Sequence, residues 1–263
     1  SIEPIVDIQG GGLPSGLRRI GLRLRVVLHK GCVLITQAFR VRRAQQRLHA
    51  FTARLRAGEP LTMASLFHGG GVMCSALHTG LAAAGVPAVT RVAVELEAAY
   101  LESSRRNNAA VFDDQTVFIE GGVQDVDLAR APTVDVLECG IPCTGASLAG
   151  RAKRHLACAE AHASAGYLFF FTLQWIERLN PAVVILENVR QYQSTASMTV
   201  IRSTLQYLGY VVQERVMGGC AFGALEDRER LVVVAMTEGL ADAGFDLASV
   251  QRIREKPERL ADV

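Results

Sequence analysis

The chain has 263 residues, of which 49% are hydrophobic and 21% charged, with a formal net charge of +2. These values are typical of a globular protein with a sizeable core and exclude an intrinsically disordered chain. No apolar run is long enough to span a membrane, and no signal-peptide pattern opens the chain. The six cysteines include no CxxC pair. We therefore expect a cytoplasmic protein with reduced thiols.

The charge is distributed unevenly along the chain. Residues 1–60 contain eleven Lys or Arg and three Asp or Glu, whereas the remaining 203 contain seventeen and twenty-three. We therefore predict a basic extension over residues 1–60, made of strands plus a helix, and a main domain over 61–263. Two interpretations of the extension remain open, contact with phosphate groups or a solvated amphipathic helix over 39–57.

Hydrophobic periodicity predicts the elements in chain order. In the extension, a strand at 22–28 can pair with a second strand at 32–36, and Gly58-Glu59-Pro60 marks a boundary. Beyond it, strands and helices alternate, which predicts an α/β fold with a mostly parallel sheet and helices on both faces. The predicted strands are 62–67, 89–94, 115–119, 134–138, 182–187, 210–216 and 230–236, and the predicted helices end near 84, 106, 179 and 208.

A glycine-rich turn follows the first strand of this domain. Phe67 and His68 lead into Gly69-Gly70-Gly71, and the next strand ends near Glu95. Glycines let the backbone approach a ligand closely, and a carboxylate at a strand end can accept hydrogen bonds from a ribose. The combination points to a cofactor that contains a nucleoside.

A cysteine follows the strand at 134–138. Cys143 comes directly after Pro142, close to the carboxyl end of that strand, where open α/β sheets build their sites. It is a candidate nucleophile. The alternative from the residues alone is an inert, half-buried thiol in a strand-to-helix turn.

Two further groups carry charge beside predicted strands. Glu187 ends an apolar strand, where loss of solvation favours its protonated form; the alternative is a cap-like acid before a helix. Arg228 and Arg230 alternate onto one face of the last strand and can hold a phosphate or a base carbonyl. A surface ion-pair cluster is the alternative for this pair. His155, Cys158 and His162 could share a helix face, but they lack a fourth ligand, so we predict no metal site.

In their order and spacing these motifs resemble those of the cytosine-5 DNA methyltransferases, over residues 62–237. The glycine turn is similar to the family's S-adenosylmethionine loop, Glu95 to its ribose-binding acid, and Gly121-Gly122-Val123 to its adenine-contacting segment. Residues 142–150 resemble the motif Pro-Cys-Gln-x-Phe-Ser-x-Ala-Gly. Glu187-Asn188-Val189 is the motif Glu-Asn-Val, and residues 222–231 resemble Gln-x-Arg-x-Arg.

The resemblance implies a Rossmann-like fold of the S-adenosylmethionine-dependent methyltransferases, and a methyl transfer to carbon 5 of cytosine in DNA, as in restriction-modification. The thiolate of Cys143 would add to carbon 6 of a flipped-out base, and Glu187 would donate a proton to the ring. Arg230, assisted by Arg228, would contact the base carbonyl or a phosphate. Residues 145–155 would form a loop that closes over DNA. The implied cofactor-binding residues are Phe67, Gly69, Gly71, Glu95, Val123 and Pro142.

The chain departs from the family pattern at several positions. Residues 141, 144, 146 and 226 differ from the motifs, and Gly122 replaces an adenine-binding Asp, which implies weaker cofactor binding. The family's target-recognition region and last motifs have no counterpart, which suggests a fragment, a subunit of a split enzyme or a degenerate relative. We expect weak, salt-sensitive DNA binding and little methyl transfer without a second subunit or downstream segment. A non-catalytic scaffold and an RNA cytosine methyltransferase are the alternatives.

Overall fold

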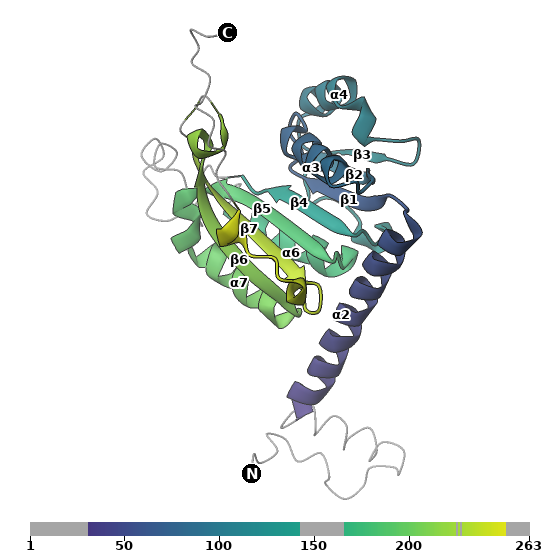
Figure 1. Cartoon of the computed structure of the whole chain (residues 1–263), viewed down its shortest axis with the longest axis vertical. Helices are drawn as coiled ribbons and strands as arrows, with labels where there is room; N and C mark the ends of the chain where they lie inside the picture. Colours follow the sequence, from purple (N-terminus) through teal and green to yellow (C-terminus); the bar gives the residue numbers. More distant parts are fainter. Residues whose placement is uncertain (1–30, 143–165, 225, 227, 251–263) are drawn as a thin grey trace, which may run out of the picture. The chain divides into compact units, whose positions relative to one another are not determined.

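The computed structural model describes residues 31–142, 166–224, 226 and 228–250, the first seven of them by their backbone alone (Figure 1). The chain divides into two compact units, residues 1–46 and 47–263, and the division falls within a helix. All strands of the sheet belong to the second unit. Among the helices in the described part, none is both long enough and apolar enough to cross a membrane.

Helix α2 (Gly31–Ala57) covers a segment that the sequence predicted as a strand and another that it predicted as a helix. The strand predicted at 32–36 is wrong, because these residues form the first turns of α2. A short apolar run fits either period, and here it continues into the helical pattern predicted over 39–57. The helix ends at Ala57 and is followed by Gly58, whose φ of +67° is a left-handed conformation. The strand predicted at 22–28 lies outside the described residues.

The second unit alternates strands and helices as the sequence predicts. Its strands are β1 (Leu61–Leu66), β2 (Ala88–Glu95), β3 (Val117–Glu120), β4 (Val136–Gly140), β5 (Val183–Val189), β6 (Tyr210–Gly218) and β7 (Glu229–Thr237). Its α-helices are α3 (Val72–Ala83), α4 (Ala98–Asn107), α6 (Leu168–Leu179) and α7 (Ala196–Tyr207). Short 3-10 helices lie at η1 (Ala109–Val111), η2 (Leu128–Arg130), η4 (Arg190–Ser194), η5 (Gly219–Phe222), η6 (Ala241–Ala243) and η7 (Leu247–Ser249).

The seven strands form one sheet in the order β3-β2-β1-β4-β5-β7-β6. Neighbouring strands from β3 to β5 are parallel, and β7 runs antiparallel to both β5 and β6. The predicted Rossmann-like α/β fold is confirmed. Strands β2 and β3 are added outward on one side of β1, and β4 and β5 on the other, where β7 then lies between β5 and the edge strand β6. Ligands of open α/β sheets bind at such a reversal, at the carboxyl ends of the strands.

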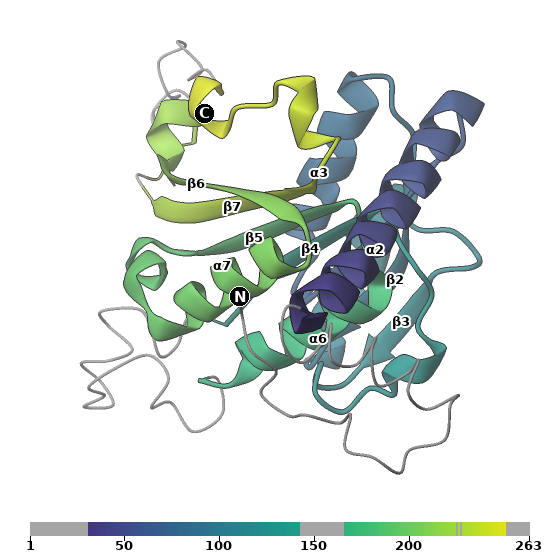
Figure 2. The same cartoon turned by 90° about the horizontal axis from the view of Figure 1, so that it is seen from below.

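The two faces of the sheet have different cores. Because side chains alternate along a strand, Leu137 and Cys139 of β4 join the apolar core beneath α6 and α7. Val136 and Glu138 point to the opposite face, where α3 packs (Figure 2). The first of these cores contains the fully buried Trp175, and the second contains Phe51 of α2. The face beneath α3 therefore holds a charged group as well as apolar side chains.

The last turns of α2 are fixed to the edge of the sheet where the parallel strands begin. Arg47 is only 4% exposed, and its guanidinium donates to the carbonyl oxygens of Leu208 and Gly209 at 2.9 and 2.8 Å. It also donates to Thr237 Oγ1 at 2.7 Å and lies 3.7 Å from the centre of the Tyr210 ring. One side chain thus ties the last turns of α2 to the loop before β6 and to the last residue of β7.

Replacing Arg47 by methionine should destabilise the second unit. Methionine keeps the apolar stem but leaves two buried carbonyl groups without this donor, so we expect the free energy of unfolding to fall by about 2–4 kcal/mol. Urea unfolding of Arg47→Met measures this loss. Arg42→Met, at an exposed position of the same helix, is the matched control and should change stability little. Equal losses from the two variants would contradict the anchoring role.

Candidate functional site

The glycine turn after β1 is held in a backbone shape that few residues adopt. Phe67, Gly69 and Gly71 all have positive φ, of 53°, 56° and 77°. The turn is tied to β2 because the N–H of His68 donates to the carbonyl of Val94 at 3.0 Å. A Cβ at Gly71 would lie 2.8 Å from both His68 Nε2 and Asn108 Nδ2, so only glycine fits there.

Glu95 connects the end of β2 to this turn. Its Oε2 accepts from the N–H of Gly69 at 2.6 Å, and its Oε1 accepts from the N–H of Glu97 at 3.0 Å. Each carboxylate oxygen has a second lone pair. The side chain thus fixes the turn and retains acceptor capacity for a ligand.

A cavity of about 480 Å³ opens at the carboxyl ends of β1 to β4. Of the residues predicted to bind a cofactor, Phe67, Gly69, Glu95, Val123 and Pro142 line it. Gly71 does not, because it packs beneath the turn against His68 and Ser104. The indole N–H of Trp175 donates to the carbonyl of Val123 at 2.9 Å and thereby fixes the wall after β3.

Several residues of the cavity wall escaped the sequence analysis. Leu96, Tyr100 and Tyr167 are exposed apolar side chains that line the cavity, and Gln124 adds an amide. Exposed apolar residues directly after a strand-end acid are the signal that points to Leu96 and Tyr100. Nothing in the local pattern identifies Tyr167, which reaches the cavity from the segment before α6.

The predicted acid and one predicted arginine meet at the neighbouring strand ends. Glu187 of β5 pairs in register with Gly140 of β4, and its Oε1 lies 2.7 Å from Arg230 Nε. Its Oε2 approaches the position of a Cβ at Gly140 to 3.7 Å, and Gly140 lines the cavity. The Glu187 carboxyl therefore lies beside the cavity wall.

Asn188 supports the segment that leads to the predicted nucleophile. This buried side chain donates from Nδ2 to the carbonyl of Ile141 at 3.0 Å and accepts from the N–H of Val189. The motif Glu-Asn-Val thus places a carboxyl at the edge with one residue and holds the residue before Pro142 with the next. Cys143 itself lies outside the described residues, as does the loop predicted at 145–155.

Two opposing effects act on the Glu187 carboxyl. Partial burial raises its pKa above the usual value of 4.5, because the charged form loses solvation. The positive charge of Arg228, an exposed residue just before β7, lowers it. The ion pair with Arg230 likewise favours the carboxylate. The group is thus placed to take up a proton when its cationic neighbours turn to another anion.

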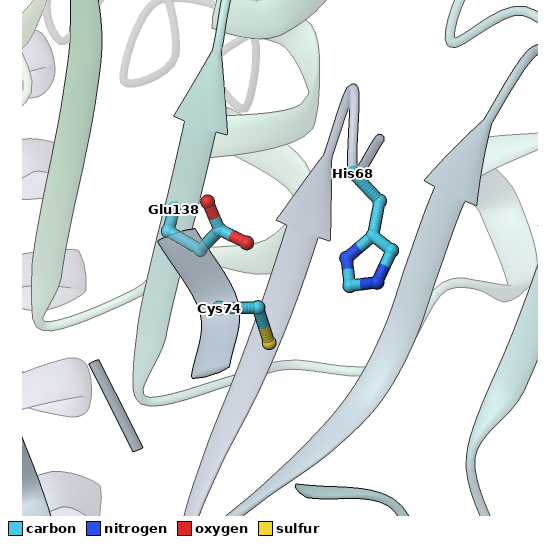
Figure 3. Close-up of side chains that lie close together, drawn as sticks. All are labelled: His68, Cys74 and Glu138. Carbon is cyan, nitrogen blue, oxygen red and sulfur yellow. The ribbon is translucent and has the colours of Figure 1, made fainter. Parts of the chain in front are cut away.

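A buried group of polar side chains lies behind the glycine turn. His68, Cys74 and Glu138 each bring one ligand-type atom within 4.8 Å of the others, and all three are buried (Figure 3). The Ser65 hydroxyl lies between two of them, 2.6 Å from His68 Nδ1 and hydrogen-bonded to Glu138 Oε1.

This group fits a hydrogen-bonded core better than a metal site. The space between His68 and Glu138 is filled by Ser65, so a cation would have to displace that hydroxyl. Burial raises the pKa of Cys74 to about 12, and the nearby Glu138 contributes to the rise, so the thiol keeps its proton. A metal needs the thiolate. We therefore assign no metal here; His155, Cys158 and His162 lie outside the described residues.

Comparisons with known proteins identify a family. A family profile described as C-5 cytosine-specific DNA methylase matches residues 61–260. Type II methyltransferase M.Eco47II of Escherichia coli is 32% identical over 190 residues, which cover 70% of this chain and 41% of that protein. Type II methyltransferase M.Bsp6I of Bacillus sp. (strain RFL6) is 30% identical over 179 residues, covering 66% and 51%.

A solved structure shares the fold at low sequence identity. A DNMT2 variant from Spodoptera frugiperda superposes with a TM-score of 0.57 at 16% identity, over 76% of this chain and 57% of that one. The chain spans about half of the length of the relatives it matches.

The ionisation of Glu138 should make stability depend on pH. Burial raises the pKa of this carboxyl from 4.5 to about 7, although the hydrogen bond from Ser65 acts against it. Because the pKa of Glu138 is higher in the folded than in the unfolded state, its contribution to the free energy of unfolding is complete below pH 4.5 and is lost as the pH rises through 7. We expect the free energy of unfolding to fall by up to about 3 kcal/mol between pH 5 and 8.

Urea unfolding at several pH values tests this expectation. Glu138→Gln, which cannot ionise, should lose this part of the pH dependence. Glu120→Gln at an exposed strand end is the control and should keep it. If all three proteins show the same slope of stability against pH, Glu138 is not the group responsible.

Proposed function

Because the chain belongs to the C-5 cytosine-specific DNA methylase family, we propose that it transfers a methyl group from S-adenosylmethionine to carbon 5 of a cytosine in DNA. One observation carries the proposal: the register pair Gly140–Glu187 puts a carboxyl directly beside a wall of the cavity at the strand ends. A group that can hold a base and a cavity that can hold a cofactor therefore share a border.

The cavity has the features that S-adenosylmethionine requires, and this cofactor would supply the methyl group. Its volume of about 480 Å³ lies within the range of small-molecule sites. Glu95 retains lone pairs for the two ribose hydroxyls, while Phe67, Leu96 and Tyr100 offer apolar surface for a purine. Gly69, with nothing within 4 Å of an added Cβ, leaves the backbone open to a ligand.

The chemistry assigned to the strand ends rests on four side chains. Cys143 follows Pro142, which lines the cavity, and its thiolate would add to carbon 6 of the cytosine so that carbon 5 becomes nucleophilic. Glu187 would give a proton to the ring nitrogen as charge builds on the base. The Arg230 guanidinium would leave its ion pair with Glu187 and bind the base carbonyl or a phosphate, and Arg228 would assist. Carbon 5 would then take the methyl group that the cofactor supplies, and loss of its proton to a water molecule would re-form the double bond between carbons 5 and 6 and release the Cys143 thiolate.

The substrate we propose is duplex DNA with the cytosine turned out of the stack. A base inside a duplex exposes neither face of its ring to a thiol, so flipping is required. Residues 61–263 would form the catalytic domain, since the family match begins at 61. Sequence specificity would come from base contacts made outside this domain, in a downstream segment or a second subunit, because phosphate contacts alone do not distinguish sequences.

The cofactor assignment predicts a thermal shift. S-adenosylhomocysteine should raise the melting temperature, because a ligand that binds only the folded state stabilises it by mass action. At about 100 times Kd the gain is roughly 3 kcal/mol. Glu95→Ala should remove most of the shift. Glu120→Ala, at the end of the neighbouring strand β3 and outside the cavity lining, should retain it. No shift in the wild type at saturating ligand would count against the cofactor assignment.

The catalytic assignment predicts a covalent adduct. In the presence of S-adenosylmethionine and of the downstream segment or second subunit that supplies sequence recognition, duplex DNA with 5-fluorocytosine should trap the protein, because fluorine cannot leave carbon 5 as a cation after the methyl transfer. The adduct, read by denaturing electrophoresis and mass spectrometry, should lie on Cys143 and be absent from Cys143→Ser. Cys220→Ser, at a half-buried thiol outside the site, is the control.

Two further arms of the same experiment separate the alternatives. Glu187→Gln should slow adduct formation by about 10²–10⁴-fold, the usual contribution of a general acid. An adduct with 5-fluorocytosine RNA and none with DNA would favour an RNA methyltransferase. No adduct with either, despite S-adenosylhomocysteine binding, would favour a non-catalytic scaffold.

A further inference from the structure

The buried polar group forms a row of hydrogen bonds that ends at the glycine turn. From Glu138 the row passes through the Ser65 hydroxyl to His68 Nδ1, and from His68 Nε2 to the Ser104 hydroxyl at 2.7 Å. Asn108 continues it: Nδ2 donates to Ser104 Oγ at 3.1 Å and to the carbonyl of Gly70 at 3.0 Å. We call Glu138, Ser65, His68 and Ser104 the buried row.

We propose that His68 is a positioning residue for the cofactor, and that the buried row ties the shape of the glycine turn to the protonation of Glu138. The proposal rests on the cofactor assignment made above. His68 belongs to the turn itself and lies between Phe67 and Gly69, which both line the cavity. Its ring supports the turn from below, since an added Cβ at Gly71 would lie 2.8 Å from Nε2.

The hydrogen bonds of the buried row can run in either of two directions, depending on whether Glu138 carries a proton. When Glu138 is ionised, the Ser65 hydroxyl donates to it, so Ser65 must accept from His68 Nδ1–H. A neutral imidazole then accepts at Nε2 from Ser104. When Glu138 is protonated it donates to Ser65, Ser65 donates to Nδ1, and Nε2–H donates to Ser104. Loss of one proton from Glu138 therefore changes the tautomer of His68 without charging the ring.

No cation compensates the ionised form among the residues that the structure describes around the row. Burial lowers the pKa of His68, so the ring is neutral near pH 7, and burial raises the pKa of Cys74 and Cys139. The groups that face the row from the surrounding elements are Ser65 of β1, Thr90 and Glu95 of β2, Cys74 and His78 of α3, and Ser104 of α4. Cys139 of β4 lies on the opposite face of the sheet, where the charges of Glu138 and of Glu187 of β5 act on it.

An uncompensated buried carboxylate favours opening of the turn. Opening admits water to Glu138 and relieves the desolvation of its charge. The cofactor would bind the turn in the shape described here, in which Gly69 and Glu95 both line the cavity and are joined by a hydrogen bond of 2.6 Å. Ionisation of Glu138 therefore reduces the population that can bind, and the apparent affinity falls by the same factor.

Calorimetric titration of the 263-residue chain with S-adenosylhomocysteine from about pH 5.5 to 9 tests the proposal. For the wild type we expect Kd to rise on the order of 3- to 10-fold between pH 6 and 8.5. Glu138→Gln keeps the hydrogen bonds of the protonated form and should bind with the affinity of the wild type at pH 6 throughout. Its profile also corrects for titration of the ligand. His68→Phe keeps the ring volume without the hydrogen bonds and should bind more weakly at every pH, with no slope of its own.

Nuclear magnetic resonance of ¹⁵N-histidine-labelled protein reads the tautomer directly. His68→Phe identifies the His68 signals among the six histidines. We expect Nε2–H below pH 7 and Nδ1–H above it in the wild type, and no change in Glu138→Gln.

Three results would overturn the proposal. The first is a wild-type Kd that does not vary with pH, and the second is a Glu138→Gln protein that keeps the wild-type slope. The third is a ligand that binds while the His68 tautomer stays fixed across the pH range. A tautomer change with no ligand binding at any pH would instead overturn the cofactor assignment and leave the row intact.

Discussion

The backbone pairing of β4 with β5 is the constraint on which the site depends. The cavity is built by the ends of β1 to β4, whereas the acid and the arginine come from β5 and β7. The two halves meet only because Gly140 and Glu187 are partners in one parallel register. A shift of one residue would turn Glu187 to the other face of the sheet. A side chain at position 140 would touch this carboxyl, since an added Cβ would lie 3.7 Å from Glu187 Oε2.

The cores on the two faces of the sheet differ in polarity. The face beneath α6 and α7 is a continuous apolar core with fully buried Trp175, Leu179 and Ile201. The face beneath α3 carries Ser65 and Glu138, whose burial destabilises the charged form of the carboxyl. The polar groups lie directly behind the glycine turn. We infer that the apolar face supplies most of the stability, so that the other face can carry groups whose state changes with conditions.

Local signals in the sequence predicted much of the fold and only part of the site. Hydrophobic runs indicated every strand of the sheet within a few residues, and most strongly the central strands β1 and β4, which are buried on both faces. They could not indicate the antiparallel insertion of β7 between β5 and β6, which depends on long-range pairing. The hydrogen bond between Ser65 and Glu138, 73 residues apart, and the four partners of Arg47 are equally invisible to local patterns. Gly71 was predicted to line the cavity by its place in a motif, whereas it packs beneath the turn.

The start of the folding unit and the start of the family match are different positions. The family match begins at residue 61, yet the compact unit begins at Arg47. Residues 47–57 lie at the amino ends of the strands, where Phe51 joins the core with Leu61 and Val136, and Arg54 pairs with Asp135 at 2.9 Å. The proposed acid, Glu187, lies at the opposite end of the sheet, where it pairs in register with Gly140 at the end of β4. A chain that starts at residue 61 would keep every residue of the proposed chemistry but lack the buried Arg47 and Phe51. We therefore expect this truncation to lower the free energy of unfolding more than it weakens cofactor binding to the folded protein.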